Sequence, residues 1–157
     1  MLHHISIAVA RPLHVAEVLS QVLMGTYAPF PPHPESYIVL ADDAYGTAIE
    51  LLPRGTELIP GVTEATFSQN SLPSPFHAVH AAISVPVSRA QIEDIGAREG
   101  WLVRQCDRGP FSVIEFWVEN QLMLEFLSPE LALQYLEFMQ PQNWRAFVAA
   151  ASVDLMS

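Results

Sequence analysis

The chain has 157 residues, of which half are hydrophobic, 15% are charged and none is lysine, and its formal net charge is −10. This length and composition suit a single folded domain and exclude a disordered or low-complexity protein. The seven arginines are scattered along an acidic chain, so the sequence also lacks the basic stripe that nucleic-acid binding requires.

The cysteine content and the hydropathy indicate where the protein works. Cys106 is the one cysteine, which excludes an internal disulfide, fits a reducing compartment and predicts a cytoplasmic protein. Arg11 and Pro12 interrupt the first apolar run, so we expect neither a secretory leader nor a membrane span. The mean hydropathy is positive, at +0.24, which predicts apolar surface buried against a partner and favours a homodimer.

The first half of the chain predicts one strand, one helix and then further strands. An alternating apolar pattern marks a strand at residues 4–9, and a stripe at helical spacing marks a helix over residues 13–24 that Gly25 can close. Prolines stiffen residues 28–34 into a loop that cannot be a central strand. Residues 37–40 and 47–52 complete this unit, which we define as module one, residues 1–55.

Residues 56–76 have the weakest pattern and are rich in Gly, Pro, Ser and Thr, so we interpret them as a linker and part of a cleft wall. Module two, residues 77–128, repeats the order of module one. It predicts a strand at 80–85, a helix at 89–99 with Ser88 as its cap, and strands at 101–106, 111–119 and 121–127.

Residues 129–157 form a predicted helical extension that begins at Ser128-Pro129. The first helix should run to about residue 139 and a further helix over residues 144–151. In these helices, large apolar side chains occupy more of the helix circumference than one buried face can cover. The extension therefore covers the core, or covers the core and also packs on a second subunit.

An internal repeat carries the candidate chemistry. The segment His-Ile-Ser-Ile-Ala-Val from His4 matches His-Ala-Ala-Ile-Ser-Val from His80, and in each copy the histidine shares a strand face with the third and fifth residues. Glu50 follows His4 by 46 residues and Glu125 follows His80 by 45, each within an apolar strand. This matched spacing indicates a chain built twice from one unit.

Each of these residues also has a simpler interpretation. A strand histidine is more often a hydrogen-bonded core or surface residue than a metal ligand, and a strand glutamate can reach water from a sheet edge. An unpaired carboxylate among Ile49, Leu51, Leu124 and Phe126 would be costly, so each glutamate needs a partner, and a metal is one candidate. Arg104 and Arg108 fit either an anionic substrate or an exposed strand end.

The repeated histidine strand and glutamate strand resemble the vicinal oxygen chelate superfamily, which includes glyoxalase I, extradiol dioxygenases and bleomycin-resistance proteins. The resemblance covers residues 1–128. It implies an α+β fold in which two βαβββ modules form an open, eight-stranded, mixed-sheet half-barrel around a metal cleft, with the C-terminal helices as an addition to one glyoxalase-like domain spanning residues 1–157.

By position, the resemblance implies that His4, Glu50, His80 and Glu125 are metal ligands, a set most like that of bacterial-type glyoxalase I. Two imidazoles and two carboxylates suit Zn, Ni, Mn, Co or Fe. The ion would act as a Lewis acid on a small substrate with two neighbouring oxygens, and Glu125, with Glu50 second, would shuttle the proton.

The expected function is therefore that of a metal-dependent, glyoxalase-like lyase or isomerase, working as a homodimer without nucleic-acid or membrane partners and without an organic cofactor. Two alternatives remain open at this point. One is a non-catalytic small-molecule binding protein of bleomycin-resistance type, and the other is an extradiol-type dioxygenase. The sequence also leaves open whether the four ligands meet within one chain or across two.

Overall fold

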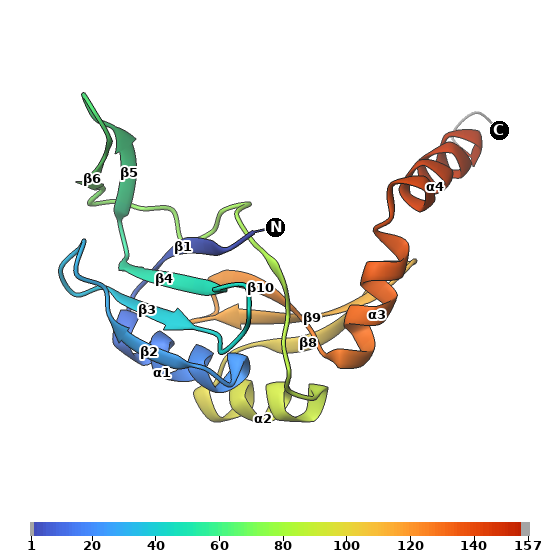
Figure 1. Ribbon diagram of the computed structural model, residues 1–157, viewed down its shortest axis with the longest axis horizontal. Helices are drawn as coiled ribbons and strands as arrows, with labels where there is room; N and C mark the ends of the chain where they lie inside the picture. The colour runs from blue at the N-terminus through green and yellow to red at the C-terminus, as the bar shows by residue number, and fades with distance from the viewer. Residues whose placement is uncertain (1, 155–157) are drawn as a thin grey trace.

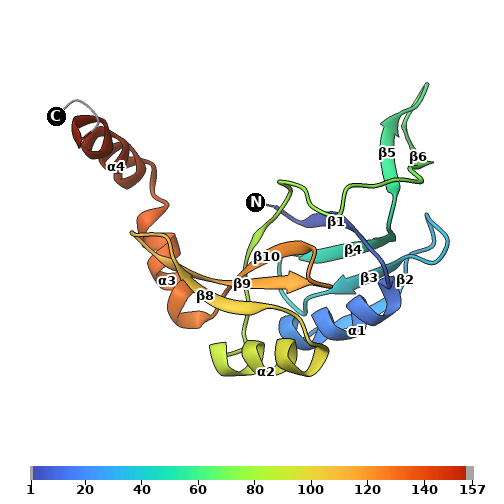
Figure 2. The same ribbon diagram turned by 180° about the vertical axis from the view of Figure 1, so that it is seen from behind.

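The computed structural model describes residues 2–154, with side chains described for residues 2–150. It shows an α+β protein with two four-stranded sheets side by side, as predicted (Figure 1). Helices α1 (Pro12–Leu23) and α2 (Arg89–Glu99) cover one side of the sheets. A two-stranded hairpin and the C-terminal helices extend from the other side, at opposite ends of the molecule (Figures 1 and 2).

The two sheets have the same topology, so the predicted duplication is present in the fold. In module one, β1 (His4–Val9) pairs in parallel with β4 (Ala48–Pro53), and β3 (Tyr37–Leu40) and β2 (Thr26–Pro29) follow in antiparallel order. In module two, β7 (Ala82–Ser84) pairs in parallel with β10 (Leu122–Leu127), and β9 (Ser112–Val118) and β8 (Val103–Asp107) follow. The orders are β1-β4-β3-β2 and β7-β10-β9-β8.

The core lies between the sheets and the two helices. Val15, Leu19 and Val22 of α1 are fully buried, and so are Leu51 of β4 and Phe116 of β9. These residues are the alternate strand positions and the helical stripe that the apolar pattern predicted. Burial of such side chains is the main stabilising term of the fold.

Two turns differ in how well the sequence anticipates them. Met24, and not Gly25, takes the left-handed conformation that ends α1, with φ 49°. Gly25 is needed for a different reason, because a Cβ atom on it would collide with the carbonyl oxygen of Leu40. Glu119 and Asn120 both have positive φ, 52° and 57°, as the predicted tight turn between β9 and β10 requires.

The N-terminus of α1 is capped by module two. The capping position is Arg11, whose side chain makes no capping hydrogen bond. Instead the backbone N–H groups of Ala10 and Arg11 donate to the carboxylate of Glu119, at 2.6 and 2.9 Å. This carboxylate joins the two modules and neutralises the partial positive charge at the helix end.

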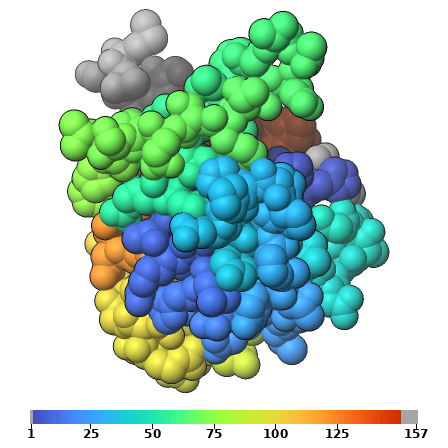
Figure 3. Space-filling view, turned by 90° about the vertical axis from the view of Figure 1, so that its left-hand side faces the viewer, coloured from blue at the N-terminus to red at the C-terminus, as the bar shows by residue number. Residues whose placement is uncertain are grey.

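The segment predicted to be a linker contains regular structure. Strands β5 (Thr56–Pro60) and β6 (Ala65–Gln69) form an antiparallel hairpin that projects from module one. Figure 3 shows this hairpin and the following linker, in green, lying across the top of that end of the molecule. The sequence pattern does not reveal the hairpin, because its strands face solvent and lack an apolar alternation.

The C-terminal extension is helical, as predicted, with α3 (Pro129–Phe138) and α4 (Pro141–Asp154). Helix α3 packs on β9 and β10 through Leu131 and Tyr135. An aromatic cluster joins α4 to α3, with Phe138 in ring contact with Trp144 and Phe147. Among the residues described, no helix has the length and apolar character that crossing a membrane demands.

Candidate functional site

Module one brings three polar side chains together on one face of its sheet. Ser6 lies opposite Glu50 in the parallel pairing of β1 and β4, and its hydroxyl donates to the Glu50 carboxylate at 2.5 Å. His4 lies two residues before Ser6 on the same face, with its Nε2 atom 3.9 Å from Glu50 Oε1. The His4 side chain is 59% exposed and that of Glu50 is 17% exposed, so both remain accessible to a small ligand.

Module two repeats this arrangement with the same register. Ala82 of β7 lies opposite Glu125 of β10, as Ser6 lies opposite Glu50, and His80 precedes Ala82 by two residues, as His4 precedes Ser6. His80 itself falls just before β7, which is shorter than predicted, and its Nδ1 atom lies 3.1 Å from the carbonyl oxygen of Ala78. The four residues predicted as ligands therefore occupy corresponding positions in the two modules, and each His–Glu pair is called here a half-site.

In the described part of the single chain, the two half-sites do not merge. No group of three or more His, Cys, Asp or Glu side chains is positioned to hold a metal ion among those residues. His4 lies beside Glu50, whereas Glu125 is paired with an arginine of the same chain. The Arg108 guanidinium donates to Glu125 Oε1 at 2.8 Å.

A buried carboxylate that the sequence analysis did not single out organises this second half-site. Glu115 lies beside Glu125 across the β9–β10 pairing and accepts hydrogen bonds from Arg104, Arg108 and the Trp117 indole. Burial opposes its ionisation, but these three donors outweigh that effect and lower the pKa of Glu115 to about 2. The signal in the sequence was a lone acid within the apolar run 112–118.

Cys106, also near Glu115, has the environment of an unreactive thiol. Burial raises the pKa of its thiol, and the neighbouring Glu115 carboxylate raises it further. The neutral thiol is thus favoured, and a thiolate nucleophile is disfavoured at neutral pH.

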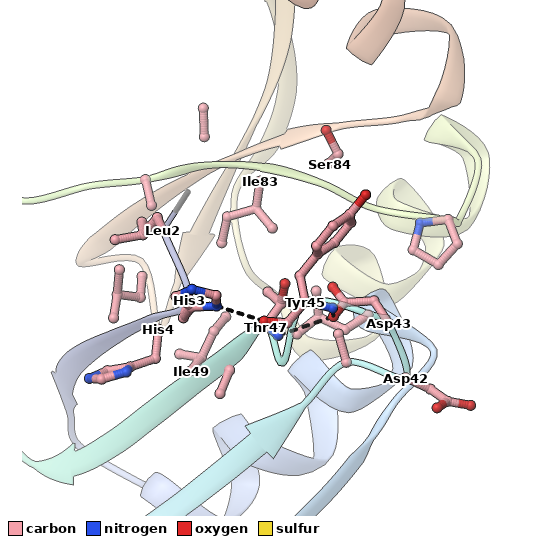
Figure 4. Close-up of a pocket in the computed structure, with 17 residues that line it drawn as sticks. Leu2, His3, His4, Asp42, Asp43, Tyr45, Thr47, Ile49, Ile83 and Ser84 are labelled. Atoms are coloured by element: carbon pink, nitrogen blue, oxygen red, sulfur yellow. Dashed lines mark hydrogen bonds between the residues drawn. The ribbon is translucent and has the colours of Figure 1, made fainter.

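Two cavities adjoin β1, one at each end of the strand. The first, of about 450 Å³, lies between residues 2–5, the β3–β4 turn and residues 81–86 (Figure 4). There the Nδ1 atom of His3 lies 2.7 Å from the carbonyl oxygen of Tyr45. The rings of His3 and His4 point in opposite directions (Figure 4). The cavity includes His4 but none of the other three predicted ligands.

The second cavity, of about 390 Å³, adjoins the first half-site through Ser6. Ser6 and Ala8 form part of its wall, together with Arg54, His77 and Val79, and neither His4 nor Glu50 lines it. The Ser6 hydroxyl, which donates to Glu50, is thus the group that connects this cavity with the half-site.

Comparison of sequences gives no relative for this chain. No protein-family profile matches it, and no curated protein is similar in sequence.

Comparison of structures finds proteins with a similar fold. The fosfomycin resistance protein FosX from Listeria monocytogenes superimposes with a TM-score of 0.55 at 13% identity, over 85% of this chain and 97% of that one. The same protein in complex with Mn(II) and sulfate gives 0.52 at 12% identity, over 80% and 86%. A putative dioxygenase from Bacillus subtilis gives 0.50 at 18% identity, over 81% of this chain and 40% of the other. The fold is that of the vicinal oxygen chelate proteins, as the repeated motif predicted.

Proposed function

We propose that this protein is a homodimeric, metal-dependent enzyme of glyoxalase-like type, acting as a lyase or isomerase on a small molecule with two neighbouring oxygens. The observation that carries the proposal is the equal register of the two half-sites. A histidine and a glutamate stand in the same relation on β1 and β4 and again around β7 and β10. Packing alone does not require polar side chains at these four positions, whereas a shared ligand does.

We infer the dimer because the two half-sites stay apart in the described part of one chain. Each module supplies one imidazole and one carboxylate, which is too few ligands to hold a divalent ion firmly. If module one of one chain faces module two of its partner, His4 and Glu50 meet the partner's His80 and the partner's Glu125. The two-fold symmetry of a homodimer then produces two such sites at once.

The donor set fits a divalent transition metal, because two imidazoles and two carboxylates suit such an ion and leave room for substrate oxygens. When bound, the ion would supply Lewis-acid stabilisation of negative charge on the substrate. The hydroxyl of Ser6 holds one oxygen of Glu50 and leaves the other directed toward His4. Glu50 and Glu125 are the carboxylates placed to move a proton, with Glu125 first.

Arg108 must release Glu125 before that carboxylate can bind a metal ion. The release does not leave the guanidinium without a partner, because Arg108 also donates to Glu115 at 2.9 Å. Since Glu115 stays ionised, Arg108 remains a fixed positive charge beside the cleft. That charge is suited to an anionic group on the substrate.

Metal analysis of single variants tests the proposal. Purified wild-type protein should bind one divalent ion per chain, and His4→Ala and His80→Ala should each weaken binding at least about tenfold, since even indirect changes around a metal cost that much. His14→Ala is the control, because His14 lies on α1, pairs with Glu99 and is outside both half-sites. Full metal content in either ligand variant would remove that histidine from the site.

Activity is tested separately, with methylglyoxal and glutathione in the presence of added Ni or Zn, and with fosfomycin as a second substrate. Turnover that is lost in Glu125→Gln supports the enzyme. A metal-free binding protein is the second candidate function, favoured by the ion pair between Arg108 and Glu125. Tight binding of a small molecule by protein that contains no metal would favour that candidate.

A further inference from the structure

Two apolar projections extend from the molecule and are called here the hairpin arm, β5–β6, and the helical arm, α3–α4. On the hairpin arm the exposed apolar side chains are Leu58, Ile59, Val62 and Phe67. On the helical arm they are Leu133, Leu136, Met139, Trp144 and Phe147. Leu133 is 71% exposed and Leu58 is 55% exposed. Apolar groups gathered in this way mark surfaces that another molecule covers.

Each arm leaves apolar surface that its own chain does not cover. A lone two-stranded hairpin is at best marginally stable in water. Among the aromatic pairs of the described residues, one joins the hairpin arm to the rest of the molecule. The ring centroids of Phe67 and His33 lie 4.7 Å apart. The helical arm packs one side of α3 on the sheet and leaves Leu133 and Leu136 on the outer side.

We propose that the hairpin arm of one copy packs on the helical arm of a second copy, twice in each dimer. Both arms stand on the side of the sheets opposite α1 and α2, at opposite ends of the molecule (Figures 1 and 2). The hairpin arm follows module one and the helical arm follows module two. A two-fold axis that sets module one against the partner's module two therefore also brings these two arms together.

The charges on the arms disfavour contact between two hairpin arms. The hairpin arm carries Glu57 and Glu64 and no basic residue, so two hairpin arms would repel each other. The helical arm carries the acids Glu130, Glu137 and Asp154 and the base Arg145, which makes no ion pair with any other residue that the structure describes. An acidic hairpin therefore gains from opposite charge only where it lies beside Arg145, which places the contact on α4.

The area is sufficient for a stable dimer. The nine exposed apolar side chains named above on the two arms are on average about half exposed. Covering each of them removes about 100 Å², half of what a large aromatic side chain buries in full, or on the order of 900 Å² per chain. A stable interface takes roughly 800 Å² from each partner.

The test uses the full chain and one substitution on each arm, Leu58→Glu and Leu136→Arg. Both side chains are exposed, so the monomer should keep its fold, which circular dichroism checks. By analytical ultracentrifugation each variant should dimerise at least about tenfold more weakly than the wild type. Leu72→Glu is the control, because Leu72 is exposed in the linker outside both arms and should leave dimerisation unchanged.

Mixing the two variants identifies which arms meet. A mixed pair keeps one intact contact and, in the other, sets the carboxylate introduced by Leu58→Glu against the guanidinium introduced by Leu136→Arg. The mixed pair should therefore form more tightly than either variant alone. A mixed pair no tighter than the variants would overturn the pairing of unlike arms. So would dimers that survive both substitutions, or a wild-type chain that stays monomeric. The proposal rests on the dimer of the proposed function, but a dimer that binds no metal would remove only the metal site.

Discussion

At the scale of single residues, the second half-site is governed by which partner each carboxylate has. Glu115 is buried, yet three hydrogen-bond donors keep it ionised, and Arg108 connects it to Glu125. Glu50 has no arginine partner among the described residues and is held by Ser6 instead. The two halves of the repeat thus share their geometry and differ in their charge balance.

Glu115 should make the protein sensitive to acid. Its pKa of about 2 in the folded state lies below the ordinary value of 4.5, so its stabilising effect is complete above about pH 4.5 and is lost as the pH falls toward 2. Glu115→Gln should lower the free energy of unfolding at pH 7 by about 1–3 kcal/mol and flatten its decline in acid. Urea unfolding across this pH range measures both effects, with Asp94→Asn on the exposed side of α2 as the control. Equal slopes for the wild type and Glu115→Gln would contradict the prediction.

At the scale of elements, the modules are joined by a helix end and a turn. The N-terminus of α1 has no capping side chain of its own, and the turn between β9 and β10 supplies Glu119 to it. Arg11 and Arg54 lie 3.7 and 3.8 Å from the same carboxylate. Helix α2, in contrast, is capped within its own module, because Ser88 and Gln91 form a reciprocal capping box.

Glu119→Ala should therefore destabilise the protein more than removal of an exposed acid does. The loss of two charge-assisted hydrogen bonds at a helix N-terminus is expected to cost about 1–2 kcal/mol. Thermal unfolding of Glu119→Ala, beside Asp94→Ala on the exposed side of α2, checks this. A melting temperature equal to that of the control would mean that Glu119 does not hold α1 in place.

At the scale of the whole molecule, two modules with the same topology can bring their predicted ligands together in two ways. The half-sites can meet inside one chain or across a dimer, and the described residues of one chain do not gather them. The two arms, which extend on the side of the sheets that α1 and α2 leave open, favour the dimer (Figure 1).

A metal that joins two chains should stabilise their assembly. At a Mn²⁺ concentration about 100 times its dissociation constant, the native state should gain about 2.7 kcal/mol, and the melting temperature should rise with protein concentration. Calorimetry with and without a chelator measures this effect, and His80→Ala should show none of it. A melting temperature that metal and chelator leave unchanged would argue for the metal-free binding protein.

The sequence by itself determined the duplication, the order of the main strands and helices in each module, and the matching positions of His4, Glu50, His80 and Glu125. These features depend on local periodicity and on side chains that repeat within short segments, such as those beginning at His4 and His80. The left-handed Met24, the capping of α1 by Glu119 and the ion pair of Arg108 with Glu125 were decided only by the tertiary structure. Each of these depends on packing between elements remote in sequence, where distance and burial, and not the residue type, select the partner.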